Sequence, residues 1–315
     1  MKKNLAKEFG NVLLAPLAEH ISKYKNLIIA PDEDLNTLPF ETFEFNGKPA
    51  IETFNMSYVP SFSVLKLMYE AGEKNSKLTN RQDLYAMGNA FYGNNDETAA
   101  QRSLENFIRG QRGEIAVNQF RNLEWANLPG SEKEINRVSE IFNNPKIFTE
   151  KSASESNLKA SNKSDELSKY KYLLFSTHGV FIPYAPEYSS IVLSQGVDKN
   201  EDGYVTIGEW AGMDLNSDVV FLSACETGLG EYQAGEGIVG IPYALTIAGN
   251  KNTVMSLWKV YDAYTPEFVG TFFKKMKEGK SAFIAINETK REFLNNPDAM
   301  YRDPAVWSAF VLYGF

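Results

Sequence analysis

Two scarce, chemically reactive side chains stand in similar places in the sequence. Cys225 is the only cysteine, and it follows the apolar run 219–224. His178 is one of two histidines, and it follows the similar run 172–177. Such runs are typical of buried parallel strands, and in open α/β sheets chemistry collects beyond the carboxyl ends of the strands. A thiol and an imidazole in these positions predict a Cys/His nucleophilic enzyme.

The alternative is that Cys225 is a structural residue. Free cysteine is among the most buried residue types, and most single cysteines behave as small hydrophobes. Since the two residues follow different predicted strands, their spacing alone does not decide between the interpretations. The other histidine, His20, lies on an amphipathic stretch beside Glu19, so we interpret it as a helix-surface residue.

Composition is that of an ordinary globular protein. The chain has 315 residues, of which 43% are hydrophobic and 23% charged, enough for one large domain or two smaller ones. Its 40 acidic and 32 basic side chains give a net charge of −8, which argues against nucleic acid and favours a basic substrate. No apolar run is long enough for a membrane span or a signal region. A single cysteine fits a reducing compartment, so we expect a cytoplasmic protein without membrane contact.

The elements that must position these residues alternate between strand and helix. Apolar runs predict strands at 27–30, 56–61, 84–88, 172–177, 219–224, 253–258 and 309–312. Helical spacing predicts helices over 265–279 and 282–294, and Ser131 and Glu134 fit a capping box. This alternation predicts an α/β fold with a largely parallel, doubly wound sheet. The polar segment 92–128 is predicted to be a loose insertion.

Short motifs extend over nearly the whole sequence. The central ones are 176–179, which contains His178, and 222–228, which contains Cys225. The outer ones lie at 35–40, 58–61, 235–237, 256–262 and 307–314. In this order they resemble the CHAT domain, a bacterial branch of the caspase/separase clan of cysteine peptidases.

The resemblance implies a caspase-like three-layer α/β/α sandwich. It implies a smaller N-terminal degenerate α/β subdomain over 1–80 and a catalytic subdomain over 81–315, which together form one CHAT domain. CHAT domains commonly follow tetratricopeptide repeats, and the sequence contains none. We therefore interpret the chain as an excised module or a short stand-alone member, and expect a repeat region or a regulatory partner in a full-length context.

The resemblance also implies the chemistry. Cys225 attacks the scissile carbonyl, His178 acts as base and then as acid, and the backbone N–H groups of Gly179 and Cys225 form the oxyanion hole. This cysteine endopeptidase chemistry requires no cofactor and no metal. The competing functions are a non-catalytic CHAT module for protein interaction or scaffolding and an α/β binding domain with a structural cysteine. The presence of both Cys225 and His178 argues against the non-catalytic module.

Asp262 and Glu226 are the predicted substrate-binding residues. In the related separases an acid at the position of Asp262 meets the basic side chain before the cleaved bond, so the resemblance implies protein substrates cut after Arg or Lys. Glu226, with Glu231 and Glu236, adds negative charge near the pocket mouth. The alternative role of Asp262 is to complement the dipole of the helix that begins near Pro266.

Two further segments of the sequence carry expectations about calcium binding and self-cleavage. Asp198 to Glu209 has the spacing of an EF-hand calcium loop, but a predicted strand precedes it where an EF-hand requires a helix. We therefore expect that calcium is not required. Arg109 and Arg112, within the predicted insertion, are the expected sites of any self-cleavage.

Overall fold

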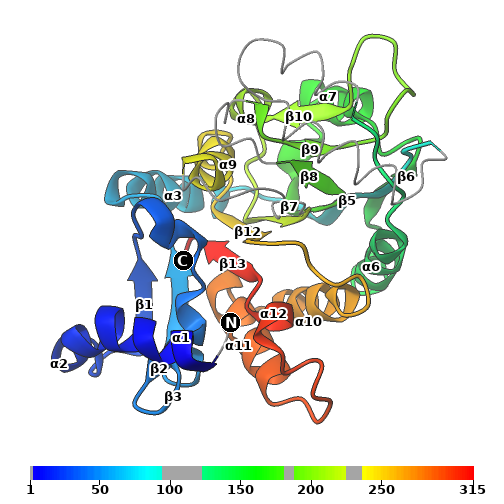
Figure 1. Ribbon diagram of the computed structural model, residues 1–315. Helices are drawn as coiled ribbons and strands as arrows, with labels where there is room; N and C mark the ends of the chain where they lie inside the picture. Colours follow the sequence, from blue (N-terminus) through cyan, green and yellow to red (C-terminus); the bar gives the residue numbers. More distant parts are fainter. Residues whose placement is uncertain (1–2, 94–122, 181–187, 225–235) are drawn as a thin grey trace, which may run out of the picture.

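An eight-stranded sheet forms the centre of the computed structural model (Figure 1), which describes residues 3–93, 123–180, 188–224 and 236–315. In spatial order its strands are β1 (Asn26–Ile29), β4 (Asn55–Tyr58), β13 (Phe310–Tyr313), β12 (Asn252–Ser256), β11 (Val219–Ser223), β7 (Tyr170–Ser176), β5 (Gln82–Ala90) and β6 (Lys146–Glu150). The predicted α/β fold with a largely parallel sheet is therefore confirmed.

The sheet consists of two parallel blocks. Strands β12, β11, β7, β5 and β6 run parallel to one another, and so do β1, β4 and β13. The blocks meet at the antiparallel pair of β12 and β13. Strands β1 and β4, from the predicted N-terminal subdomain, belong to this sheet, and the division at residue 80 stays a prediction.

Smaller ladders and helices surround the sheet. A three-stranded ladder contains β8 (His178–Val180), β9 (Ser190–Val192) and β10 (Tyr204–Thr206), and a hairpin contains β2 (Glu44–Phe45) and β3 (Lys48–Pro49). The helices are α1 (Lys3–Phe9), α2 (Ala18–Ile21), α3 (Phe62–Asn75), α6 (Pro129–Ser139), α7 (Glu155–Lys163), α8 (Ile207–Ala211), α9 (Glu236–Ile247), α10 (Thr265–Lys277), α11 (Ala282–Leu294) and α12 (Pro304–Trp307). Within the described ranges, no helix combines the length and the apolar composition needed to cross a membrane.

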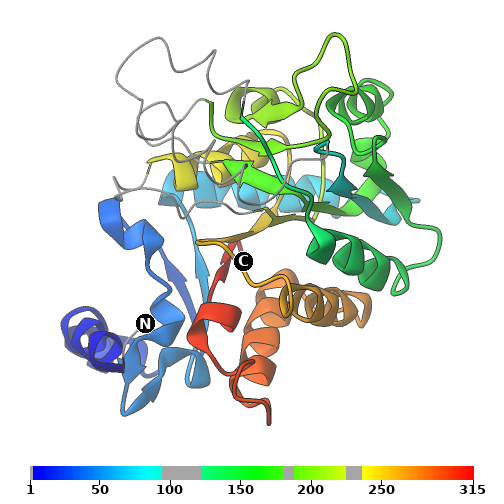
Figure 2. The same ribbon diagram turned by 45° about the vertical axis from the view of Figure 1, so that its right-hand side comes forward.

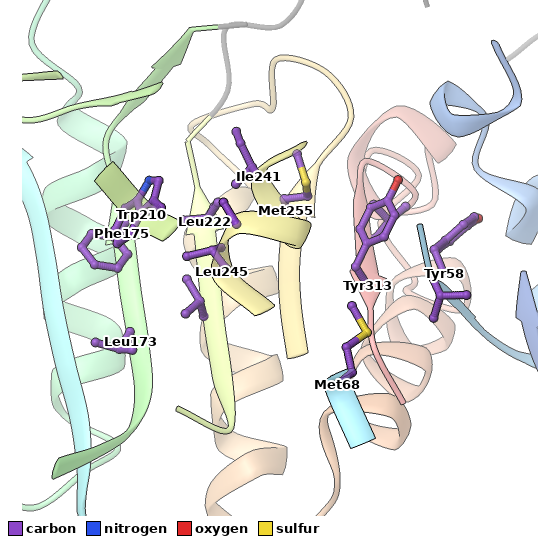
Figure 3. Close-up of a cluster of buried hydrophobic side chains, with 14 of the residues drawn as sticks. Tyr58, Met68, Leu173, Phe175, Trp210, Leu222, Ile241, Leu245, Met255 and Tyr313 are labelled. Atoms are coloured by element: carbon purple, nitrogen blue, oxygen red, sulfur yellow. The ribbon is translucent and has the colours of Figure 1, made fainter. Parts of the chain in front are cut away.

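The helices cover both faces of the sheet and produce three layers. Figures 1 and 2 show α3 and α9 (cyan and yellow) on one side and α10 and α11 (orange) on the other. Alternate residues of β11 serve the two faces, because successive strand side chains point to opposite sides. Leu222 belongs to the buried cluster that contains Leu245 of α9 (Figure 3), whereas Phe221 packs on Phe272 of α10 at 5.2 Å between ring centroids.

Candidate active site

Strands β7 and β11 lie side by side and end at the same edge of the sheet. Their register pairs Ser176 with Ser223, and these residues stand two positions before His178 and Cys225 in the sequence. Both Cys225 and Glu226 lie outside the described residues.

Gly179 lies against the backbone that leads into Cys225. The carbonyl oxygen of Ala224 is 2.6 Å from the place where a Cβ atom on Gly179 would stand. Any side chain at position 179 would therefore displace the segment directly before Cys225. The motif at 176–179 is thus in contact with Ala224, the last described residue of the motif at 222–228.

The imidazole of His178 is buried and held by its surroundings. The rings of Tyr92 and Trp125 each lie 4.9 Å from it between centroids. Its Nε2 is 2.7 Å from the carbonyl oxygen of Ala126. Since a carbonyl oxygen only accepts hydrogen bonds, Nε2 bears the proton of the neutral ring and Nδ1 is left as the proton acceptor.

The surroundings of His178 keep it neutral. Its pKa is lowered to about 4, mainly by burial and to a smaller extent by the charge of Lys259. The hydrogen bond to Ala126 and the charge of Asp262 raise the pKa but do not offset these effects. At pH 7 the ring is therefore an uncharged base. This is the protonation state that a general base requires before it takes a proton.

The groups that hold His178 come from the predicted loose insertion, 92–128. The structure differs from that prediction at both ends of the segment, because Tyr92 and Trp125 are 3% and 2% exposed. The indole Nε1 of Trp125 donates a hydrogen bond to the Tyr204 hydroxyl at 2.8 Å. The polar average of the segment concealed these anchors. Residues 94–122, with Arg109 and Arg112, lie outside the described residues.

A cavity of about 40 Å³ lies beside His178, between the start of α6, the ends of β7 and β11, and the loop before α10. Asp262 lines this cavity together with His178, so the structure brings these two predicted site residues to one place. The preceding strand, β12, pairs with β11. Asp262 is exposed, and it packs on Gly130, where a Cβ atom would lie 2.8 Å from the Asp262 Cβ.

Glu134 is a second acid of this cavity, and it is not among the predicted site residues. The interpretation of Ser131 and Glu134 as a capping box is wrong, because α6 begins before them at Pro129. Instead, Ser131 Oγ donates to the Ser176 carbonyl, and Glu134 Oε2 accepts from Ser223 Oγ at 2.9 Å. The sequence signal for this role is that Ser131 and Glu134 share a helix face with the apolar residues Ile135 and Val138.

The segment with calcium-loop spacing has a different arrangement. Strand β9 precedes it, and Glu209 forms a capping box with Thr206 at the start of α8. The ammonium group of Lys159 lies 2.7, 2.6 and 2.8 Å from carboxylate oxygens of Glu155, Glu201 and Glu209. A lysine thus occupies the centre of the acidic group on which a cation would have to bind.

A comparison of the sequence with known protein families identifies the family of this chain. The sequence matches the CHAT domain over residues 3–315. The chain belongs to the CHAT domain family. No curated protein matches the sequence.

Solved structures place this CHAT domain among caspase-like folds. The fold is similar to that of gingipain R (RgpB), described as an Arg-specific cysteine proteinase, with a TM-score of 0.50 and 9% identity over 99% of this chain and 67% of that chain. The Saccharomyces cerevisiae separase, in its complex with securin, matches with a TM-score of 0.45 and 16% identity over 89% of this chain. The match spans only 14% of the separase chain.

Proposed function

We propose that this CHAT domain is a cysteine endopeptidase that cleaves proteins after Arg or Lys, with Cys225 as nucleophile and His178 as base. The observation that supports it most is the buried, neutral imidazole whose Nε2 is bound to Ala126 and whose Nδ1 is left to accept a proton. Gly179, the next residue, lies against the segment that enters Cys225.

The proposed reaction has two halves. Nδ1 of His178 takes the thiol proton of Cys225, and the thiolate attacks the scissile carbonyl carbon, whose oxygen accepts hydrogen bonds from the N–H groups of Gly179 and Cys225. The imidazolium then gives its proton to the leaving amine as the C–N bond breaks, which leaves a thioester. Water, deprotonated by the same imidazole, attacks the thioester and releases the acid and the thiol.

Specificity for a basic side chain is supported by acids. Asp262 lines the cavity beside His178, and the chain has a net charge of −8, which attracts cationic substrates. Glu226 belongs to the proposed mouth of the same pocket. The proposal also includes a cytoplasmic location, and a tetratricopeptide-repeat region or a regulatory partner in a full-length context.

Variants of the two histidines and of Cys225 test the proposal on internally quenched peptides with Arg before the scissile bond. Cys225→Ala and His178→Ala should each abolish cleavage while the far-ultraviolet circular dichroism spectrum is kept. The control variant, His20→Ala, changes an exposed site of α2 and should leave the cleavage rate unchanged. Substantial turnover by Cys225→Ala would contradict the assignment. Absence of cleavage by the wild-type protein across a peptide library would favour the non-catalytic, scaffolding alternative.

Asp262→Asn tests the specificity. Loss of an Arg–carboxylate contact should reduce turnover of Arg peptides by roughly a hundredfold, while the labelling rate of Cys225 by iodoacetamide should hardly change. Equal loss of both would mean that Asp262 acts only on the local structure. A native preference for Asp before the scissile bond would refute the proposed substrate class.

A further inference from the structure

The cavity beside His178 contains two carboxylates at different depths. Asp262 is exposed and packs on Gly130, whereas Glu134 is 1% exposed. Gly130 and Glu134 are four residues apart on α6, so their positions differ by about one turn, a rise of roughly 6 Å. One acid therefore stands at the rim and the other at the buried end.

The two oxygens of Glu134 differ in their hydrogen bonding. Oε2 accepts from Ser223 Oγ at 2.9 Å. The buried Oε1 has no hydrogen bond of good geometry from the described residues, although the Ser176 hydroxyl is near enough to the carboxyl group to lower its pKa. A buried acceptor left without a donor is costly, and native proteins retain such groups where something else completes them. Glu134 is among the residues that line the cavity, so a ligand bound there is placed to bring the hydrogen-bond donor that this oxygen lacks.

The first turns of α6 are fixed in place around this acid. Ser131 Oγ accepts a hydrogen bond from the backbone N–H of Asn89 at 2.7 Å and donates to the carbonyl of Ser176. These contacts join α6 to the ends of β5 and β7. Glu134 is therefore held in a rigid frame, which is what a specificity pocket needs.

The shape and charge of the cavity limit the ligand. At about 40 Å³ it has room for roughly three water-sized volumes, which suits a slender unbranched chain better than a ring. Its titratable lining residues are Glu134, Asp262, Lys259 and His178. A guanidinium has five donors in a planar fork and can bridge two acceptors, whereas an ammonium is a compact point charge.

We propose that Glu134 is the buried anchor of the substrate pocket and selects Arg over Lys, because a guanidinium donates to Glu134 Oε1 and to Asp262 at the same time. The inference rests on the proposed endopeptidase function for its substrate, and it adds a second specificity residue on a different element. Lys, with one terminal nitrogen, reaches the rim acid and gains little from Glu134.

Kinetics with matched peptides test this selection. Peptides that differ only in Arg, Lys or citrulline before the scissile bond should show that Glu134→Gln reduces kcat/KM for Arg by about 30-fold, mainly through KM, and for Lys by less than threefold. The Arg/Lys ratio should therefore fall about tenfold. Glu132→Gln, at an exposed site on the same helix, should change nothing. Equal losses for all three peptides, or none for Arg, would overturn the inference.

Binding without turnover separates this inference from the proposed function. In the Cys225→Ala background, calorimetric titration with acetyl-arginine amide should show binding that Glu134→Gln weakens at least tenfold and that acetyl-citrulline amide does not reproduce. If this binding is found while the wild-type protein cleaves no peptide, the peptidase proposal is refuted and the pocket is retained. Binding indifferent to Glu134 would overturn the pocket even if cleavage occurs. If Glu134→Gln does not fold, Glu134→Asp, which retracts the carboxylate by one methylene group, gives the same comparison.

Discussion

Among single residues, the cavity places a neutral acid beside a neutral base. Burial raises the pKa of Glu134 to about 8, although the hydroxyls of Ser223 and Ser176 lower it. Burial lowers the pKa of His178 to about 4. Because the folded-state pKa of Glu134 lies above its usual value, its contribution to stability is present at acid pH and is lost as pH rises towards 8.

The protonation of Glu134 predicts a pH dependence. Binding of a guanidinium needs the carboxylate, so kcat/KM for Arg peptides should rise by about tenfold per pH unit from pH 6 to pH 8 and then level off. Glu134→Gln should remove this rise, and citrulline peptides should not show it. The control variants are Lys259→Met and Asp262→Asn, which change the other charged groups beside His178 and should keep the rise of kcat/KM with pH. An unchanged rise in Glu134→Gln would assign it to another group.

Among the elements, regular patterns were predictable and tertiary contacts were not. The predicted helix over 282–294 is α11, with Ser281 Oγ accepting from the N–H of Ile284 at 3.3 Å. Helical periodicity placed Glu134 on a helix, but only the packing of α6 against β11 gives it Ser223 as a partner. Likewise, periodicity predicted the last strand but not its antiparallel direction, which depends on its neighbour in space.

Helix α7 supplies the lysine at the centre of the acidic group. Lys159→Met would leave Glu155, Glu201 and Glu209 facing one another without a counter-ion, so the melting temperature should fall by roughly 5 °C. Calcium should restore part of this loss in the variant, because three carboxylates then share an empty centre.

The control for this prediction is Lys163→Met, an exposed site at the end of α7, which should have little effect. For the wild-type protein, neither calcium nor a chelator should move the melting temperature. A fall on chelation that calcium reverses would mean that the wild-type loop binds the ion.

At the scale of the whole molecule, α11 joins the first 60 residues to the rest of the chain. Asn287 hydrogen-bonds both the N–H and the carbonyl of Met56 in β4, at 2.8 and 3.0 Å. Lys290 forms an ion pair with Glu41, and both side chains are at most 1% exposed. Tyr58 donates to the same carboxylate at 2.5 Å. The N-terminal segment is therefore locked to the C-terminal half by buried polar contacts.

Removal of the lysine from this pair should be costly. Lys290→Met should lower the free energy of unfolding in urea by about 3–5 kcal/mol, because a buried carboxylate loses its counter-ion. The double variant with Glu41→Gln should lose clearly less than Lys290→Met alone. Lys48→Met, in an exposed pair with Glu52, should cost under about 1 kcal/mol. A double variant as unstable as the single one would mean that the charge itself is unimportant.

The position of β13 has a consequence for biosynthesis. This strand is the last along the sequence, yet in the sheet it lies between β4 and β12 and connects the two parallel blocks. A nascent chain therefore leaves the ribosome with two open sheet edges, which only Phe310–Tyr313 can close. Until those residues emerge, both edges are free to pair with other chains. The order of synthesis thus delays completion of the sheet until β13 has been translated.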